Sequence, residues 1–214
     1  DGWSNGDYVG SDWRSSQVQP RDGVVSLVLD ANPDAEKGFS SGEIQTHAFF
    51  EHGYFEARLQ AAKGNGIVTG FFTYTGPTFG DPWDEIDIEI LGRNTRQVQF
   101  NYFTDGVTAE PVTMDLPFDA AEGLHTYAFE WLPDRINWYV DGELMHSEDG
   151  TDNLALPENP QKLYIGMWNG RGLDDWLGTF RWKGEPLVAK VGCVSYQTER
   201  GSGPSCSTAE SAER

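Results

Sequence analysis

The chain has 214 residues, which suits a single domain with a sizeable core, and its 34 acidic against 15 basic side chains give a formal net charge of -19. That charge argues against nucleic acid or an anionic membrane as a partner, because both are bound through positive surface. No apolar run approaches the ~18 residues of a membrane span. Aromatic residues make up 13% of the chain and include eight Trp, and such flat, amphipathic rings are suited to stacking on sugars.

The predicted secondary structure consists of short strands separated by turns rich in Gly, Asp and Asn. Residues 31–41 are expected to form a loop, and residues 118–122 are the one short helix candidate. The strands at 43–49 and 54–60 are expected to pair as a hairpin, and Asp141-Gly142 is a strong hairpin turn. In chain order, strands are expected at residues 24–30, 43–49, 54–60, 66–75, 83–92, 97–104, 125–132, 136–140, 143–146, 162–168 and 189–198.

Many short strands with glycine-rich turns predict an all-β fold, an antiparallel β-sandwich or jelly roll of the concanavalin-like type, with a concave face on which a polymer can lie. We expect residues 1–198 to form this domain and residues 199–214 to be a flexible tail, disordered or tied down only at Cys206. Cys193 and Cys206 are either joined in a disulfide, as in a secreted protein, or present as free thiols.

Residues 83–92 read Trp-Asp-Glu-Ile-Asp-Ile-Glu-Ile-Leu-Gly, an alternation of acidic residues and isoleucine. Because successive side chains of a strand point to opposite faces, Glu85, Asp87 and Glu89 share one face and the isoleucines share the other. Three carboxylates about 6–7 Å apart repel one another and do not stabilise a strand, which favours a functional role for them.

Glycoside hydrolysis with retention requires two carboxyl groups about 5–5.5 Å apart, one as nucleophile and one as general acid and base. Positions i and i+4 of a strand lie ~13 Å apart at Cα, and two glutamate side chains that lean together close most of that gap. Such a cluster titrates as a coupled set and retains at least one proton to higher pH than an isolated glutamate. By itself, the pattern also fits a solvated amphipathic strand, and it fits less well a calcium site, whose ligands usually come from loops.

The sequence around this strand closely resembles family 16 glycoside hydrolases, and among them bacterial lichenases, which are endo-1,3-1,4-β-glucanases, and the related succinoglycan-cleaving glycanases. The uninterrupted Glu-Ile-Asp-Ile-Glu is the lichenase form, whereas many 1,3-β-glucanases of the family insert a residue there. The resemblance covers residues 1 to about 198 and rests on residues 71–77, 83–89, 98–102, 125–131, 138–142, 168–170 and 174–178, in the family's usual order.

The resemblance implies a jelly-roll sandwich in which Glu85 is the nucleophile, Glu89 is the general acid and base, and Asp87 assists. No cofactor and no catalytic metal are expected. Taken alone, Phe72 and Trp168 are better explained as core residues and Asn5 as a turn residue. As residues that hydrogen-bond to sugars or stack on them, the resemblance implies Asn5, Glu43, Phe72, Tyr74, Trp83, Asn101, Trp168 and Trp176.

The chain departs from lichenases at several positions. Gln45 stands where lichenases of the Bacillus type have a cleft arginine, and Phe103 stands where they have a tyrosine, which changes two polar contacts that help to select the glucan. Gly192 replaces a calcium-ligating aspartate and leaves a structural calcium open. Ser11 and Ser41 replace a pair of cysteines found in some relatives. The chain also begins where relatives have passed their first strand, which we interpret as a missing N-terminal segment.

We therefore predict an endo-acting, retaining β-glucan hydrolase for mixed-linkage 1,3-1,4-β-glucan, monomeric, with the polysaccharide as its partner and neither nucleic acid nor membrane. It is expected to be secreted or extracellular, although no signal peptide is visible in this chain. The alternatives are a glycanase for succinoglycan or another exopolysaccharide, a transglycosylase, and a non-catalytic carbohydrate-binding sandwich. His125 lies in an alternating apolar strand and is expected to make a structural hydrogen bond rather than to act as a base.

Overall fold

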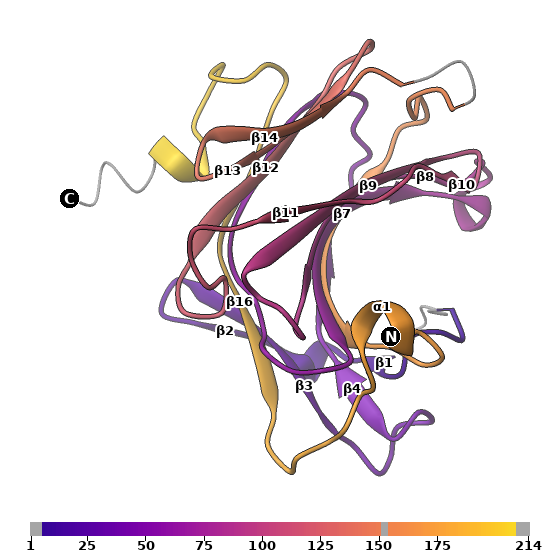
Figure 1. Cartoon of the computed structure of the whole chain (residues 1–214), viewed down its shortest axis with the longest axis vertical. Helices are drawn as coiled ribbons and strands as arrows, with labels where there is room; N and C mark the ends of the chain where they lie inside the picture. Colours follow the sequence, from indigo (N-terminus) through magenta and orange to yellow (C-terminus); the bar gives the residue numbers. More distant parts are fainter. Residues whose placement is uncertain (1–5, 151–153, 209–214) are drawn as a thin grey trace.

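The computed structural model describes residues 6–150 and 154–208, which form two β-sheets packed face to face (Figure 1). In spatial order, the first sheet contains β1 (Asp12–Trp13), β4 (Phe39–Ser41), β3 (Val24–Ala31), β16 (Leu187–Gln197), β6 (Gly53–Gln60), β12 (His125–Trp131), β13 (Ile136–Val140) and β14 (Glu143–Glu148), with β2 (Val18–Arg21) paired to β3. The second contains β10 (Val107–Thr108), β9 (Gln97–Thr104), β8 (Asp84–Leu91), β7 (Ile67–Thr75), β15 (Lys162–Asn169) and β5 (Glu43–Gln45), with β11 (Val112–Asp115) paired to β9. All pairs are antiparallel except β1 with β4, and the predicted antiparallel sandwich is confirmed.

Helical structure is scarce in the described chain. It comprises the 3₁₀ turns η1 (Ser15–Gln17) and η2 (Pro77–Phe79), the single-turn helix α1 (Asp174–Leu177) and a short turn at residues 206–208. None of the described helices has the length and apolar character needed to cross a membrane.

The hydrophobic core lies between the two sheets and is rich in aromatic rings. Phe55 and Phe129 of the first sheet stack with their ring centroids 4.9 Å apart, and Phe71 of the second sheet lies 5.4 Å from Phe129. Trp131 and Trp138 are also completely buried or nearly so. Burial of each large apolar side chain contributes about 1.5–3 kcal/mol, so these inward-facing rows hold the two sheets together.

The predicted hairpin between residues 43–49 and 54–60 is wrong. The strand that begins at Glu43 ends at Gln45, and β5 pairs with β15 in the second sheet. β6 pairs instead with β12 and β16 in the first sheet. The residues between β5 and β6 therefore cross from one layer to the other, with His52 in a left-handed conformation (φ 58°) just before β6.

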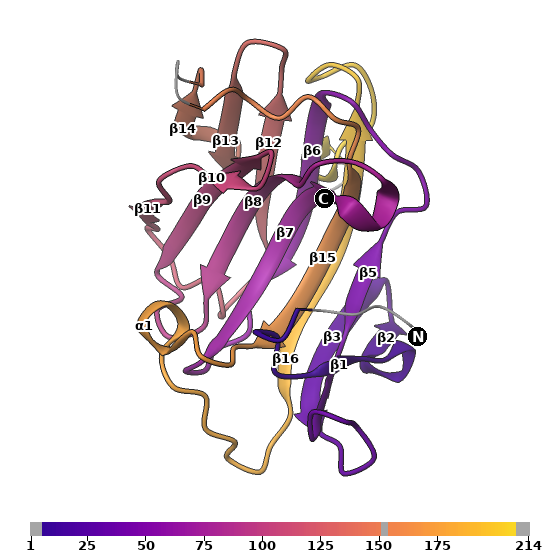
Figure 2. The ribbon, with the colours of Figure 1, turned by 90° about the vertical axis from the view of Figure 1, so that its right-hand side faces the viewer.

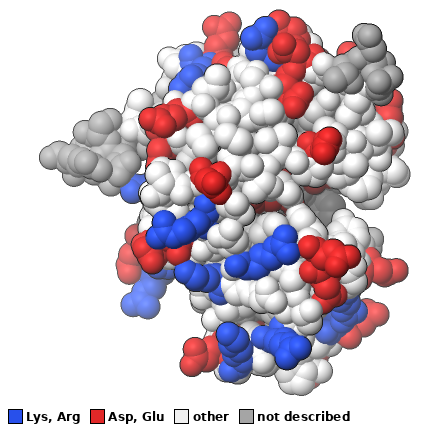
Figure 3. All heavy atoms as spheres, in the orientation of Figure 1, with Lys and Arg blue, Asp and Glu red and all other residues white. Residues whose placement is uncertain are grey.

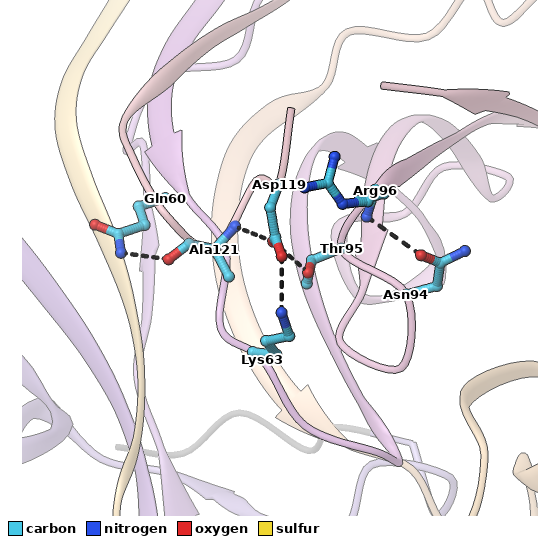
Figure 4. A network of polar contacts seen from close by, with 7 residues as sticks. All are labelled: Gln60, Lys63, Asn94, Thr95, Arg96, Asp119 and Ala121. Carbon is cyan, nitrogen blue, oxygen red and sulfur yellow. Dashed lines mark hydrogen bonds and ion pairs between the residues drawn. The ribbon is translucent and has the colours of Figure 1, made fainter. Parts of the chain in front are cut away.

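The predicted helix at residues 118–122 is also wrong, because side-chain hydrogen bonds hold this segment as a turn (Figure 4). The carboxylate of Asp119 accepts hydrogen bonds from Thr95 Oγ1 (2.5 Å), the Ala121 amide (3.1 Å) and Lys63 Nζ (2.7 Å). Gln60 Nε2 donates to the Ala121 carbonyl at 2.7 Å. The Ala120 amide donates to the Thr95 carbonyl and the Glu122 amide donates to the Asp119 carbonyl, which is the pattern of a turn and not of an α-helix. A further difference is β4, which forms within the predicted loop at 31–41.

The segment that follows β16 is attached to the first sheet at several points. Cys193 and Cys206 form a disulfide, so of the two alternatives the bonded state is present. Ser207 Oγ donates to Glu56 Oε1 at 2.6 Å, and the Arg200 guanidinium lies 4.2 Å from the centre of the Tyr139 ring. Residues 209–214 of the predicted tail lie outside the described residues.

His125 has the structural role that its strand pattern predicts. Its Nδ1 lies 2.8 Å from Oδ2 of Asp141, and its ring stacks on Phe118 with the centroids 3.4 Å apart. It belongs to β12 in the first sheet.

Candidate active site

A cleft of about 730 Å³ lies on the open face of the second sheet. Figure 2 looks onto this face, with β9, β8, β7 and β15 side by side, and in Figure 3 the outline of the molecule is notched on the right where the face curves inward. The predicted residues that line the cleft are Glu43, Phe72, Tyr74, Trp83, Glu85, Asp87, Glu89 and Trp168.

Strand β8 presents its acidic residues to the cleft as the alternation predicts. Ile86, Ile88 and Ile90 are at most 1% exposed and belong to the core, so Glu85, Asp87 and Glu89 point the other way. On the neighbouring strand β7 their partners are Tyr74, Phe72 and Gly70, respectively. Because Gly70 has no side chain, it leaves room beside Glu89.

The cleft raises the pKa of all three carboxyls on β8. Burial raises the pKa of Glu85 to about 7, although hydrogen bonds with Asp87 and Trp83 act to lower it. Burial, and then the charge of Glu85, raise the pKa of Glu89 to about 8. Burial and both neighbouring glutamates hold the pKa of Asp87 well above its ordinary value. All three carboxyls therefore keep their protons to higher pH than isolated acids do.

Trp83 directly precedes β8 and contacts the first glutamate. Its indole Nε1 donates a hydrogen bond of 2.5 Å to Oε2 of Glu85. One side of the indole is covered by Phe103 of β9, whose ring is nearly parallel at 11° with a centroid distance of 4.7 Å. Phe103 thus supports Trp83 by stacking and brings no hydroxyl to this position.

A fourth carboxyl enters the cleft from the edge strand β5. Glu43 lies over Gly166 of β15, where a Cβ would be only 3.0 Å from Glu43 Oε2, so the close approach depends on glycine. Burial, and then the charge of Glu85, raise the pKa of Glu43 to about 8. Glu43 can therefore be a hydrogen-bond donor as well as an acceptor near neutral pH.

Aromatic rings form much of the remaining surface. Phe72 stacks on Tyr164, with ring centroids 5.1 Å apart and an interplanar angle of 8°. Tyr74 lies 6.5 Å from Trp83. Trp168 meets Tyr8 edge to face at 5.8 Å. Such rings offer flat apolar surface on which the faces of sugars stack.

Two predicted sugar-contact residues, Asn101 and Trp176, are not among the described residues that line the cleft. Asn101 pairs with Asp87 across β9 and β8 and is 8% exposed, and its amide donates to Thr108 Oγ1 at 3.0 Å. Trp176 in α1 lies 6.0 Å from Trp168, and its indole donates to Gln99 Oε1 at 2.8 Å. Asn5 lies outside the described residues.

Several cleft residues were not predicted from the sequence. Tyr164 alternates with Trp168 on β15, so the period of two that placed Trp168 on this face also identifies Tyr164. Tyr8 lies in a turn and Phe79 in the 3₁₀ turn η2, where no strand pattern points to a face. Gln45, which stands at the position of the cleft arginine, pairs with Tyr164, and its Oε1 has no hydrogen-bond partner within the described chain.

The structure gives no support for calcium at Gly192. Across residues 6–150 and 154–208, no group of three or more His, Cys, Asp or Glu is placed to hold a metal ion. Gly192 lies at the irregularity of β16 between Val191 and Cys193, and a Cβ there would be 3.2 Å from the Leu124 side chain. The position supplies no carboxylate, and the space beside it is taken by the Leu124 side chain.

Comparison with known proteins agrees with this geometry. The profile of Glycosyl hydrolases family 16 matches residues 5–184. The chain is 48% identical to a β-glucanase of Bacillus amyloliquefaciens over 92% of this chain and 80% of that protein. Its fold matches a β-glucanase of Bacillus licheniformis (TM-score 0.84, 44% identity, 92% of this chain and 89% of that one). It also matches a β-1,3-1,4-glucanase (lichenase) from a mouse hindgut metagenome (TM-score 0.86, 40% identity, 92% and 91%). The chain therefore belongs to family 16 of the glycosyl hydrolases.

Proposed function

We propose that this glycoside hydrolase is an endo-acting, retaining β-glucanase that cleaves mixed-linkage 1,3-1,4-β-glucan. The observation that carries the proposal is the row of Glu85, Asp87 and Glu89 in a cleft bordered by aromatic rings. Relatives and structural neighbours named β-glucanase and lichenase support the choice of substrate.

In the proposed first step, the Glu85 carboxylate attacks the anomeric carbon and the glycosidic C–O bond breaks. Glu89 gives its proton to the leaving oxygen, and a covalent glycosyl ester with Glu85 results. In the second step, Glu89 takes a proton from water, the water oxygen attacks the anomeric carbon, and the ester bond breaks to restore the Glu85 carboxylate. The chemistry requires no cofactor, and calcium has no part in it.

The hydrogen bonds of the two glutamates support these roles. The nucleophile must be ionised while the acid is still protonated, and the hydrogen bonds of Glu85 with Asp87 and Trp83 act to lower its pKa, whereas the charge of Glu85 acts to raise the pKa of Glu89. Asp87, with its raised pKa, is the group that shares a proton with Glu85 through their hydrogen bond. This arrangement resembles other sites in which neighbouring carboxyls are held in different protonation states.

For substrate binding, we propose that Trp83, Tyr74, Phe72 and Trp168 provide stacking surface and that Glu43 hydrogen-bonds to sugar hydroxyls. Trp176 supports Trp168, and Asn101 lies beside Asp87 on the neighbouring strand β9. Asn5 remains a proposed hydroxyl contact on the family resemblance alone.

The charge of the cleft favours a neutral polymer over an acidic exopolysaccharide such as succinoglycan. Four carboxyls line it, and among the described lining residues there is no Lys or Arg. On the face drawn in Figure 3, most Lys and Arg lie in the lower half of the molecule and leave the notch to other residues. An anionic chain would therefore find no cation in the described lining to pair with its own charge.

A reducing-sugar assay on barley β-glucan, lichenan, laminarin, xyloglucan and succinoglycan tests the proposal, with product linkage and initial anomer determined by NMR. We expect cleavage of the two mixed-linkage glucans with β-anomers formed first. Activity on laminarin alone, or on succinoglycan alone, would overturn the substrate. Formation of α-anomers first would overturn retention, and glucan binding without new reducing ends would leave a carbohydrate-binding sandwich. Added acceptor sugars test for transglycosylation.

We also propose that the protein is an extracellular monomer. The Cys193–Cys206 disulfide supports an oxidising compartment, where such bonds persist. A single species of about 24 kDa in size-exclusion chromatography with light scattering is the expected result, consistent with a chain of 23.8 kDa.

A further inference from the structure

Three side chains form a compact cluster at one end of the cleft, and none of them is a catalytic carboxyl. Phe49 and Phe79 meet edge to face, with their ring centroids 5.2 Å apart at 87°. Lys162 Nζ lies 5.3 Å from the centre of the Phe49 ring and 5.0 Å from that of Phe79. Edge-to-face rings and a cation over a ring are both attractive arrangements, so each member restricts the other two.

The cluster joins segments that are distant in the chain. Phe79 ends the 3₁₀ turn η2 between β7 and β8, Phe49 lies between β5 and β6, and Lys162 begins β15. Figure 2 shows the turn after β7 beside the upper end of β15, next to the chain that leaves β5. Side chains from two other backbone segments thus contact Phe79, and these contacts favour a single defined position for its ring.

The strand register makes the cluster continuous with the catalytic row. Lys162 of β15 pairs with Tyr74 of β7, and Tyr74 pairs with Glu85 of β8. The Tyr74 ring lies 6.3 Å from Phe79 on one side and 6.5 Å from Trp83 on the other. Phe79 and its neighbour Thr78 line the cleft, whereas Phe49 and Lys162 do not. Phe79 therefore extends the aromatic surface one ring beyond Tyr74.

Neither ring of the cluster is fully buried. Phe49 is 41% exposed, and Phe79 is only partly buried. Phe79 carries no group that can take part in proton transfer or nucleophilic attack, so its contribution must come from its apolar surface. The Lys162 ammonium lies over the two rings outside the cleft lining, which argues against a role in binding an anionic substituent.

We propose that Phe79, supported by Phe49 and Lys162, is an additional platform that binds a glucosyl unit of the β-glucan chain by stacking. The inference rests on the proposed glucanase function and adds to it a contact remote from the reacting bond. Such a contact strengthens binding of chains long enough to reach it and leaves the chemical step unchanged.

Kinetics on purified mixed-linkage oligosaccharides of increasing length, and on barley β-glucan, test the platform. We expect Phe79→Ala to raise KM about three- to tenfold for the polymer and the longer oligosaccharides, the range given by loss of one aromatic contact, with kcat within about twofold. The shortest cleavable oligosaccharides should keep the wild-type KM. Phe79→Trp should retain tight binding of long chains, and Phe49→Ala should raise their KM by less than Phe79→Ala does.

Leu144→Ala is the matched control, because Leu144 is 57% exposed on β14 of the other sheet, and it should change none of these values. The platform would be refuted if Phe79→Ala had the wild-type KM for oligosaccharides of every length, or if its KM rose equally at every length. Either result would leave the proposed hydrolase function unaffected. If the wild-type protein cleaves no glucan, the proposed function fails by itself. In that case, calorimetry measures the binding of the same oligosaccharides to the wild-type protein and to Phe79→Ala. The platform requires that Phe79→Ala bind the long oligosaccharides more weakly than the wild type does and bind the short ones equally well.

Discussion

The indole Nε1 of Trp83 donates a 2.5 Å hydrogen bond to Oε2 of Glu85, the proposed nucleophile. The donor comes from the residue two positions earlier in the chain, just before β8 begins. Phe103 stacks on the indole and limits its rotation. A hydrogen bond to the charged form of a carboxyl stabilises that form, so Trp83 opposes the effect of burial and helps to keep Glu85 ionised beside two other carboxyls.

Trp83→Phe should shift the acidic limb of the kcat/KM profile to higher pH by about one unit. The substitution keeps an aromatic ring but removes the donor, so the pKa of Glu85 rises, and the attacking carboxylate is then available only at higher pH. The measurement is the pH dependence of kcat/KM on β-glucan. Trp182→Phe is the control, because Trp182 packs against Phe39 and does not line the cleft. It should leave the acidic limb at the wild-type pH. An unshifted limb in Trp83→Phe would refute this role for the indole.

Glu89→Gln should lower kcat on β-glucan by about 10²–10⁴-fold, because the leaving oxygen is no longer protonated. With an aryl glycoside, whose leaving group needs little protonation, the loss should be much smaller. Glu85→Gln should lower kcat at least as far with both substrates, because no covalent intermediate can form. Glu143→Gln, an exposed acid on β14, is the control. Turnover near wild type in either cleft variant, with an unchanged circular dichroism spectrum, would contradict the assignment.

Glu43→Gln should stabilise the fold at alkaline pH but not at acidic pH. The pKa of Glu43 is raised in the folded state to about 8 from an ordinary 4.5, so the folded state binds more protons between these values. The stability that this proton provides is complete below about pH 4.5 and is lost as pH rises through 8. Glutamine is neutral throughout, so the gain in Tm over wild type should grow as pH rises through 8, by about 2–4 °C for each kcal/mol of stability in a chain of this size.

Scanning calorimetry at pH 5, 7 and 9 measures that gain. Glu51→Gln, on an exposed loop residue, should show no such growth with pH. A gain of equal size at pH 5 and pH 9 would exclude linkage to the Glu43 proton.

Asp84→Ala should destabilise the fold by about 2–4 kcal/mol. The Asp84 carboxylate is completely buried and accepts hydrogen bonds from the amides of Asp105, Glu158 and Asn159 and from the Asn159 side chain, at 2.9–3.2 Å. Alanine leaves these donors without an acceptor. Urea denaturation should show the loss, and Asn at this position should recover part of it. Asp34→Ala, at an exposed turn whose backbone is not left-handed, should be within about 0.5 kcal/mol of wild type. A similar small effect for Asp84→Ala would contradict this structural role.

Replacing Cys193 and Cys206 together by Ser should lower the free energy of unfolding by about 3 kcal/mol. Their positions are 13 residues apart, and a closed loop of this length restricts the unfolded chain by about that amount. The disulfide is attached to β16 in the first sheet, whereas the cleft lies on the second sheet, so activity at 25 °C should be retained. Urea denaturation with and without reductant measures the effect. Equal midpoints for the wild-type and double-Ser proteins under oxidising conditions would count against it.

The family resemblance and the strand pattern anticipated much of the cleft, and the reasons differ by residue. Glu85, Asp87 and Glu89 follow from a period of two on one strand, which depends only on the pleat. Phe72, Tyr74 and Trp168 were placed by resemblance, and the register of β7 and β15 brings them to the same face. Tyr8 and Phe79 lie in turns, whose direction depends on contacts with distant parts of the chain.

The amino-acid sequence alone determined the strand content, the two faces of β8 and the excess of negative charge, because each depends on local alternation or on composition. Only the tertiary structure decided that β5 and β6 belong to different sheets, that Cys193 bonds to Cys206, and that Phe49, Phe79 and Lys162 meet. These are relations between segments that are separated along the chain, and what selects them is the burial of the two inward faces against each other, which no local pattern records.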